Sequence, residues 1–133
     1  MLFRSVGNAL DFANSSGDQP SRIFTAKFSS GGTQQWIKIH NNGNYVHENA
    51  KSAVADNNGN IYVGAEINDS ASFVSDMLAF KLNNAGTQRW EQRGDGAAGE
   101  NDFVSAILKD NLNNVYVTGK SGNASYEIGR AHV

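Results

Sequence analysis

The chain has 133 residues, a formal net charge of -2 and no cysteine, with 39% hydrophobic and 18% charged residues. This composition is typical of one modest soluble domain, and it excludes disulfides and thiolate metal sites. Because the basic residues never cluster and no apolar run approaches about 20 residues, we expect no nucleic-acid partner and no membrane insertion.

The two ends of the chain differ from the rest. Residues 1–5 resemble the translated reverse complement of a common short-read sequencing adapter, and residues 127–133, which end in IGRAHV, match the translated adapter itself. We therefore exclude both ends from the fold prediction, as one excludes a tag. Residues 6–126 are then expected to be a fragment of a longer protein that was cut at both ends.

Alternation of apolar and polar residues predicts a series of short strands. The first begins near residue 6, and the second, over residues 23–28, has Phe24, Ala26 and Phe28 on one face. Fourteen glycines and a single proline favour such strands, joined by tight turns, over helices. The later strands are predicted, in chain order, over residues 34–39, 50–54, 60–65, 77–82, 88–93, 104–108 and 114–119.

The strands repeat along the chain at a fixed offset of 54 positions. Around residues 11–19 the first copy carries about three extra residues. A period near 50 indicates a repeat architecture, and four short strands per period is the pattern of a β-propeller blade. The residues that recur after 54 positions are Lys27, Gly32, Thr33, Gln34, Trp36, Asp56, Asn57, Asn60, Tyr62 and Val63.

At these residues the chain resembles the bacterial SBBP-type β-propeller repeat. The resemblance rests on AVADNNGNIYVG at residues 53–64, FKL at 80–82, GTQRW at 86–90 and VYVTG at 115–119. It implies an all-β fold of antiparallel four-stranded propeller blades, with one complete blade over about residues 49–93 between two partial blades. It also implies a large exported or cell-surface bacterial protein, in which the remaining blades of the parent propeller are the partners of this segment.

The segment Asp56-Asn57-Asn58-Gly59-Asn60 has the oxygen ligands and the glycine of a calcium loop. It carries a single carboxylate, however, whereas a calcium loop supplies several. Its repeat at residues 110–114 also has leucine in the third position. We interpret both segments as structural turns, with Asn58-Gly59 as the two central residues of a tight hairpin.

Two histidines and two tryptophans are further candidates for chemistry. His40 and His47, with Glu48 nearby, could act as metal ligands or as a base with its orienting acid. Neither recurs as a histidine in the second copy, and we interpret them as part of a solvated loop. Trp36 and Trp90 could stack on sugars, but their equal placement in both copies favours packing between blades. No nucleophile or phosphate-binding motif is present, so the sequence predicts no catalytic, cofactor or metal site.

The connections between the predicted strands fall into two classes. Those at residues 29–33, 56–60, 83–87 and 110–114 are short and keep their length, whereas the others are longer and differ between copies. In an up-and-down blade, alternate connections emerge on the same side, so the long ones should share one face, where binding residues tend to lie. Solvated loop charge is the alternative interpretation of each polar residue there. The predicted ligand-facing residues are His47, Glu48, Asp69, Asp76, Asp95, Glu100 and Asp102.

We therefore predict a non-catalytic repeat segment that acts as a scaffold or as a protein- or glycan-binding module. The alternative is an accessory or catalytic propeller domain of a polysaccharide-degrading enzyme, with its active residues outside this segment. From the family resemblance alone, the location is expected to be extracellular or at the cell surface.

Overall fold

The computed structural model describes residues 3–10, 21–40, 46–69, 74–94, 96 and 99–122. All the regular structure in this part of the chain is antiparallel β-strand, as the alternation predicted. No helix of the described residues is long and apolar enough to cross a membrane. The nine strands are β1 (Phe3–Leu10), β2 (Ser21–Phe28), β3 (Gln34–Ile39), β4 (Val46–Ala55), β5 (Ile61–Asp69), β6 (Ser75–Leu82), β7 (Gln88–Gly94), β8 (Asp102–Lys109) and β9 (Val115–Ser121).

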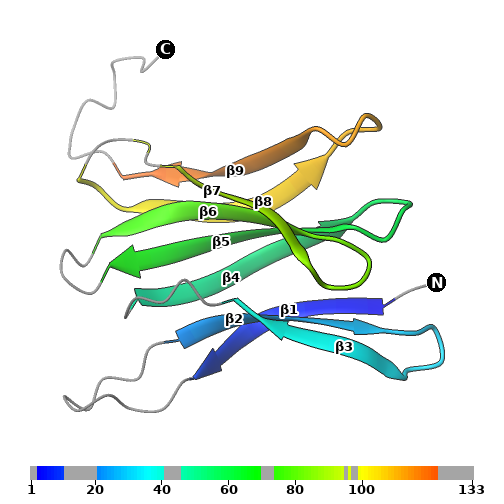
Figure 1. Ribbon diagram of the computed structural model, residues 1–133. Helices are drawn as coiled ribbons and strands as arrows, with labels where there is room; N and C mark the ends of the chain where they lie inside the picture. The colour runs from blue at the N-terminus through cyan, green and yellow to red at the C-terminus, as the bar shows by residue number, and fades with distance from the viewer. Residues whose placement is uncertain are drawn as a thin grey trace.

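The strands form three sheets, with the orders β1-β2-β3, β4-β5-β6-β7 and β8-β9. We call these the first, middle and third sheets, and Figure 1 shows them stacked in chain order. The strand β4 packs against β1 and β2, and β8 packs against β4, β5 and β6. Within the described residues the sheets form an open row, and no ring closes.

The hydrogen-bonded register repeats with the sequence period. Lys27 pairs with Trp36 in the first sheet, and Lys81 pairs with Trp90 in the middle sheet. In both sheets the register shifts immediately after the lysine. The β4–β5 and β8–β9 pairs also shift at equivalent points, between residues 50 and 52 and between residues 104 and 106. Because even these irregularities recur with the sequence period, the repeat extends to the details of strand pairing.

The first sheet departs from the period at its N-terminal strand. Phe3 pairs with Phe28, and Ile61 pairs with Leu82. Phe28 and Leu82 are one sequence period apart. Phe3 and Ile61, in contrast, are separated by four positions more than one period. The connection before β2 is therefore longer than the one before β6. Residues 3–5, which we excluded from the fold prediction, belong to β1.

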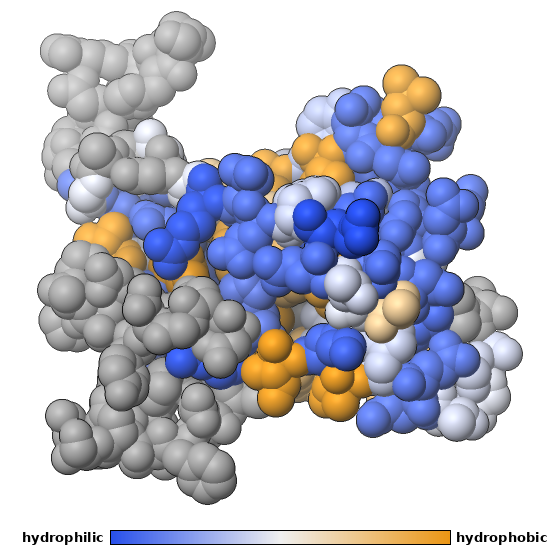
Figure 2. All heavy atoms as spheres, in the orientation of Figure 1, coloured by the Kyte–Doolittle hydropathy of each residue, from blue (hydrophilic) through white to orange (hydrophobic). Residues whose placement is uncertain are grey.

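The buried core is concentrated in the two central strands of the middle sheet. All of residues 61–67 are buried, because β5 lies between β4 and β6 within its sheet and also contacts β8 of the third sheet. Apolar side chains remain exposed on the outer sheets, including those of Ile37 and Ile39 on β3 and Leu112 in the β8–β9 turn; Figure 2 shows apolar patches over both regions. The core side chains are Ile23, Ile61, Val63, Ala65, Ile67, Leu78, Phe80 and Leu82.

Candidate functional site

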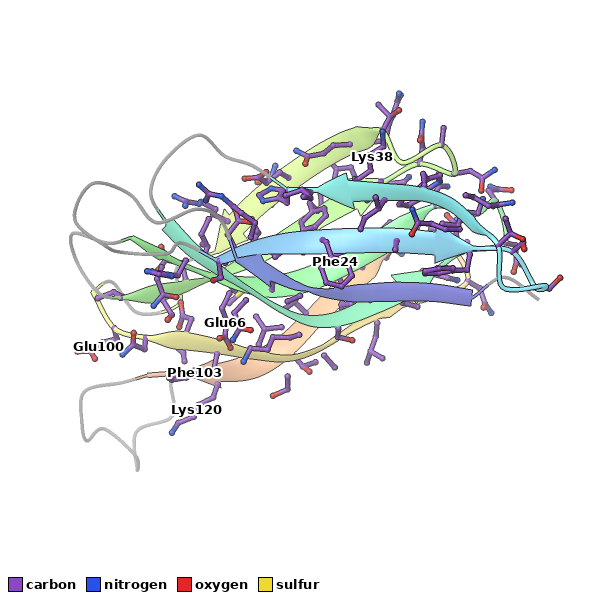
Figure 3. All side chains as sticks on the ribbon, turned by 90° about the horizontal axis from the view of Figure 1, so that it is seen from below. Phe24, Lys38, Glu66, Glu100, Phe103 and Lys120 are labelled. Carbon is purple, nitrogen blue, oxygen red and sulfur yellow. The ribbon has the colours of Figure 1, made fainter. Side chains whose placement is uncertain are left out.

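The short turns and the strand ends that enter the longer connections lie at opposite ends of the sheets (Figure 1). The β2–β3, β4–β5, β6–β7 and β8–β9 turns lie at the end we call the turn side. The strand ends that enter the other connections lie at the opposite end, the loop side, where Figure 3 places Glu100. At the described strand ends, the prediction that the long connections share one side is confirmed.

The seven predicted ligand-facing residues are divided between the loop side and the interior. Asp95 and the side chain of Asp69 lie outside the described part of the chain. His47 on β4, Asp76 on β6 and Glu100 before β8 are half-buried on the loop side. These last three are the predicted residues whose described side chains remain partly accessible.

The other two predicted residues, Glu48 and Asp102, are only 0% and 1% exposed. They occupy equivalent positions of the repeat, near the starts of β4 and β8. Glu48 Oε2 accepts a hydrogen bond of 3.2 Å from the backbone N–H of Ile23, in the first sheet. Ser21 Oγ, also in the first sheet, donates to the Glu48 carbonyl at 2.8 Å. The structure therefore places these carboxylates inside the protein, where a ligand on the loop side does not reach them.

Glu48 belongs to a cluster that we call the His40 junction, formed by His40, Glu48 and Glu91. His40 follows β3, and its Nδ1 lies 2.7 Å from Glu48 Oε1 on β4. Its Nε2 lies 2.7 Å from Glu91 Oε2 on β7. The ring stacks on Phe80, with centroids 4.7 Å apart. His40 is only 7% exposed, so the prediction that it lies in a solvated loop is wrong.

The charges of the His40 junction favour a protonated imidazole. Burial by itself lowers the pKa of His40, but the hydrogen bonds to Glu48 and Glu91, together with their negative charges, outweigh it and raise the pKa above the ordinary 6.5. A protonated histidine donates from both nitrogens, which matches its two carboxylate acceptors. Since both nitrogens are engaged, neither is open to a metal or to a substrate proton.

A cavity of about 120 Å³ opens beside the His40 junction. Liquid water occupies about 30 Å³ per molecule, so this space holds a few waters, whereas ligand pockets run to about 300 Å³ or more. Figure 3 labels Lys38, which lies at this cavity. The lining residues are Thr25, Lys38, Ile39, His40, Phe80, Leu82, Gly86 and Gln88. Among the described residues, no group of three or more His, Cys, Asp or Glu side chains is placed to hold a metal ion.

The second copy of the repeat has no counterpart of the His40 junction. Gly94 stands at the position equivalent to His40, and Asp102 stands at the position equivalent to Glu48. Asp102 Oδ2 accepts a hydrogen bond of 2.6 Å from the backbone N–H of Gly96. Its Oδ1 is buried and has no hydrogen-bond partner in the described part of the chain. The two equivalent carboxylates therefore differ in how completely their charge is compensated.

A third buried carboxylate, Glu66 on β5, joins the middle sheet to the third sheet. Its Oε1 accepts a hydrogen bond of 2.9 Å from the backbone N–H of Val104 on β8, and its Oε2 lies 3.2 Å from Lys51 Nζ. Figure 3 shows Glu66 lying toward the third sheet, on which Phe103 is labelled. The contact between these two sheets is thus polar as well as apolar.

A second junction, which we call the turn clasp, joins the first and middle sheets on the turn side. Trp36 Nε1 donates a hydrogen bond of 3.0 Å to the backbone carbonyl of Asn84, in the β6–β7 turn. Lys27 Nζ approaches the same carbonyl at 3.4 Å and also bonds to Asn84 Oδ1. Trp36 therefore packs between neighbouring sheets, as predicted, whereas Trp90, for which the same packing was predicted, contacts Tyr62 of its own sheet among the described residues.

The Asp56 carboxylate accepts four hydrogen bonds from its own turn and from Tyr62, near the start of β5. Oδ1 accepts from the backbone N–H groups of Asn58 and Asn60, at 2.9 Å each. Oδ2 accepts from Asn60 Nδ2 at 2.8 Å and from the Tyr62 hydroxyl at 3.0 Å. Asp110 makes the same four bonds in the second copy. The interpretation of these segments as structural turns is confirmed.

The predicted two-residue turn at Asn58-Gly59 is wrong. Of the residues in the first copy's turn, Gly59 alone has a positive φ, of 82°. Its amide donates to the Asp56 carbonyl at 3.1 Å. This is a three-residue hairpin loop, in which a type I turn is followed by one left-handed residue. In the second copy Asn113 takes that position, with φ of 64°, and asparagine tolerates this backbone better than most residues.

Reasoning from the sequence missed most of the residues that join the sheets. His40 was assigned to a solvated loop, and no role was predicted for Asn84, Glu91 or Glu66. The available signal was a carboxylate inside an otherwise uncharged segment, since Glu66 lies within residues 61–67, where no other residue is charged.

Among known proteins, no family model matches the chain, and a search of curated proteins finds none that matches it in sequence.

Proposed function

We propose that this chain is a segment of a non-catalytic β-propeller, a scaffold that presents its long connections to a protein or a glycan. The observation that carries the proposal is the repeat of the sequence period in register, in bulges and in turn hydrogen bonds. The first strands of successive units, β4 and β8, also pack against each other. Such packing is expected of the inner strands of neighbouring propeller blades.

The polar clusters support a scaffold because they hold sheets together. Partners within the protein bind both nitrogens of His40, both oxygens of Glu66 and the Asn84 carbonyl of the turn clasp. A catalytic acid or base needs a free position toward its substrate. These groups are instead occupied by partners within the protein.

The loop side supports the binding role. Binding residues concentrate on loops that a rigid scaffold positions. His47, Asp76 and Glu100 are the described candidates that remain partly accessible there. By the resemblance to SBBP repeats, we assign the parent protein to the bacterial cell surface or the extracellular space.

The test uses tandem arrays of one repeat unit, residues 49–102. The arrays contain from about four to eight copies, the range in which propellers close. A propeller gives one copy number at which the array is a compact monomer with a single cooperative unfolding transition. Small-angle X-ray scattering and sedimentation velocity measure this. A radius of gyration that grows steadily with every added copy indicates an open superhelix and overturns the proposal.

A further inference from the structure

Among the described residues, the strand β9 has no neighbouring strand on the side away from β8. The third sheet has the order β8-β9, whereas β5, the counterpart of β9, pairs on that side with β6. All of residues 61–67 in β5 are buried, whereas residues 118–121 in β9 are exposed. Tyr62 is 2% exposed and its counterpart Tyr116 is 52% exposed. The position that β6 fills in the middle sheet is thus unfilled beside β9 in the described part of the chain.

A groove of about 250 Å³ lies along this edge. Its apolar lining includes Met77 from the middle sheet and Phe103, Val104 and Val117 from the third sheet. Figure 3 shows Phe103 and Lys120 on the third sheet, and Lys120 is one of the polar residues that line the groove. An open backbone edge beside an apolar groove is the arrangement that accepts an added β-strand.

The middle sheet also carries an unfilled copy of the turn clasp. Lys81 and Trp90 are the counterparts of Lys27 and Trp36, which bind the Asn84 carbonyl. Lys81 Nζ lies 5.3 Å from the centre of the Tyr62 ring, and Trp90 packs against the same ring at 6.3 Å. Neither side chain donates a hydrogen bond to the described residues. Within the described residues, the two donors that hold a turn in the first interface therefore bind no turn in the second.

We propose that the β9 edge and the Lys81/Trp90 pair together bind one β-hairpin with the sequence pattern of residues 75–94 of this chain. Within the middle sheet that same hairpin pairs through β6 with β5, while its turn lies in the clasp of the first sheet. The strand β9 lies one sequence period after β5, which pairs with β6. The Lys81/Trp90 pair likewise lies one period after Lys27 and Trp36, which hold the β6–β7 turn. One hairpin is therefore the right size and shape to reach both.

The repeat specifies the register of the added strand. In the middle sheet Ile61 faces Leu82, Val63 faces Phe80, and Ala65 faces Leu78. In the complex, residues 115, 117 and 119 of β9 should face the residues equivalent to 82, 80 and 78. The apolar alternation of the hairpin then fills the groove, and its turn carbonyl receives the Lys81 and Trp90 donors.

The test uses a fluorescein-labelled peptide of residues 75–94 added to the full chain, with fluorescence anisotropy as the measure. We expect saturable one-to-one binding, and none by a scrambled peptide of the same composition. Hydrogen–deuterium exchange should slow over residues 115–121 when the peptide is bound. Absence of saturable binding, equal binding of the scrambled peptide, or protection of β3 in place of β9 overturns the inference.

Matched tryptophan variants test the clasp. Trp90→Phe removes one hydrogen bond, and we expect affinity for the peptide to fall about tenfold. Trp36→Phe changes the equivalent residue of the first sheet, which already binds the β6–β7 turn of its own chain. Peptide affinity should therefore stay unchanged in this variant. Equal effects of the two variants contradict the proposed position of the turn. Circular dichroism of both variants checks that each still folds.

This inference rests on the repeat in the proposed function but not on ring closure, so the two fail separately. If the peptide binds while tandem arrays stay open, the β9 edge is a hairpin site and the propeller is wrong. If an array closes while the peptide does not bind, the propeller stands and this inference is wrong.

Discussion

The three buried carboxylates differ in what compensates their charge. Glu48 has His40 and a backbone N–H, and Glu66 has Lys51 and a backbone N–H. Asp102 has one backbone N–H, and its other oxygen has no partner among the described residues. An uncompensated buried charge is costly, whereas a paired one is costly to break. We therefore expect these equivalent positions of the repeat to have opposite effects on stability.

Neutralising the two equivalent carboxylates should change stability in opposite directions. Asp102→Asn retains an acceptor for Gly96 and replaces a buried carboxylate, which has one hydrogen-bond partner among the described residues, by a neutral amide that costs less to bury, so it should stabilise the chain by about 1 kcal/mol. Glu48→Gln breaks the ion pair with His40 and should destabilise it by about 3 kcal/mol. Urea unfolding followed by circular dichroism measures both. A loss of stability in Asp102→Asn contradicts this account.

The His40 junction makes stability depend on pH. The pKa of His40 is raised above 6.5 in the folded chain, so the folded state retains the proton to higher pH than the unfolded state. The stabilisation is fully present below about pH 6.5 and is lost as pH rises through the raised pKa. The groups facing the ring are Glu48 and Glu91, with Lys38 lining the adjoining cavity.

The urea midpoint of the unmodified chain should therefore fall between about pH 6 and pH 9, and His40→Gln should remove most of this fall. His47 is unchanged in that variant, so it serves as an internal control for histidine titration elsewhere. An unchanged pH slope in His40→Gln would show that the junction is not the source.

The two turn aspartates provide a matched pair that differs in burial. Burial acts to raise the pKa of Asp56, but hydrogen bonds from Asn60, Tyr62 and the Asn58 amide outweigh it and hold that pKa below its usual range. Asp56→Ala leaves the buried Tyr62 hydroxyl without its acceptor, and we expect a loss of about 2 kcal/mol. Asp110→Ala removes the same four bonds at an exposed turn, so water replaces them and the loss should be smaller.

Thermal unfolding of the two alanine variants measures this difference. The contribution of Asp56 is present above about pH 3.8 and is lost as pH falls through its lowered pKa. Equal losses in the two variants would show that burial does not set the strength of these bonds.

Among the elements, the turns combine local backbone demands with contacts between strands. Gly59 has a left-handed backbone, and a Cβ there would lie 2.8 Å from Asn84 Cγ in the neighbouring turn. Gly32 has a similar φ of 86°, but a Cβ added there would meet no atom within 4 Å. Gly32 is therefore favoured by its left-handed backbone alone. Gly59 is favoured by its backbone and also because a side chain there would clash with Asn84.

Alanine at these two glycines should separate the requirements. Gly32→Ala should cost about 1 kcal/mol, the strain of a left-handed residue with a side chain. Gly59→Ala should cost more, because it also displaces Asn84 from the turn clasp. Urea midpoints measure the costs, and an equal cost at both sites would mean that Asn84 moves aside freely.

At the scale of the whole molecule, apolar side chains remain exposed on both outer sheets. Ile37 and Ile39 on β3 are 48% and 59% exposed, and Leu108 on β8 is 55% exposed. The strands β3 and β8 belong to the sheets at opposite ends of the stack (Figure 1), so these exposed apolar side chains lie in two separate regions of the molecule. Exposed apolar patches and open strand edges promote association between chains.

The chain by itself should therefore self-associate at micromolar concentration. Replacing Ile37 and Leu108 together by lysine puts charge on both faces and should shift the chain toward monomer. Sedimentation velocity measures the distribution. A monomeric unmodified chain at high concentration would show that these faces do not support association.

Local signals were enough for the strands and the repeat. Alternation predicted the strands, because side chains on a strand point to opposite faces with a period of two. The fixed offset between copies predicted that Trp36 packs between sheets, and the single carboxylate of Asp56 favoured a structural turn. These predictions depend on neighbours in the chain or on equivalence between copies, and both can be read from the sequence.

The tertiary structure alone decided which polar residues are buried and what they contact. Glu48 was predicted to face a ligand and His40 to lie in a solvated loop, yet the two form an ion pair between sheets. Glu91, the third member of the junction, lies 51 residues from His40 in sequence. Sequence alternation assigns a residue to one face of its own strand, but it does not specify which sheet packs on that face. For that reason the sequence by itself determined the strands, their repeat and the structural role of the Asp56 and Asp110 turns, and only the packing of the sheets determined the junctions that hold them together.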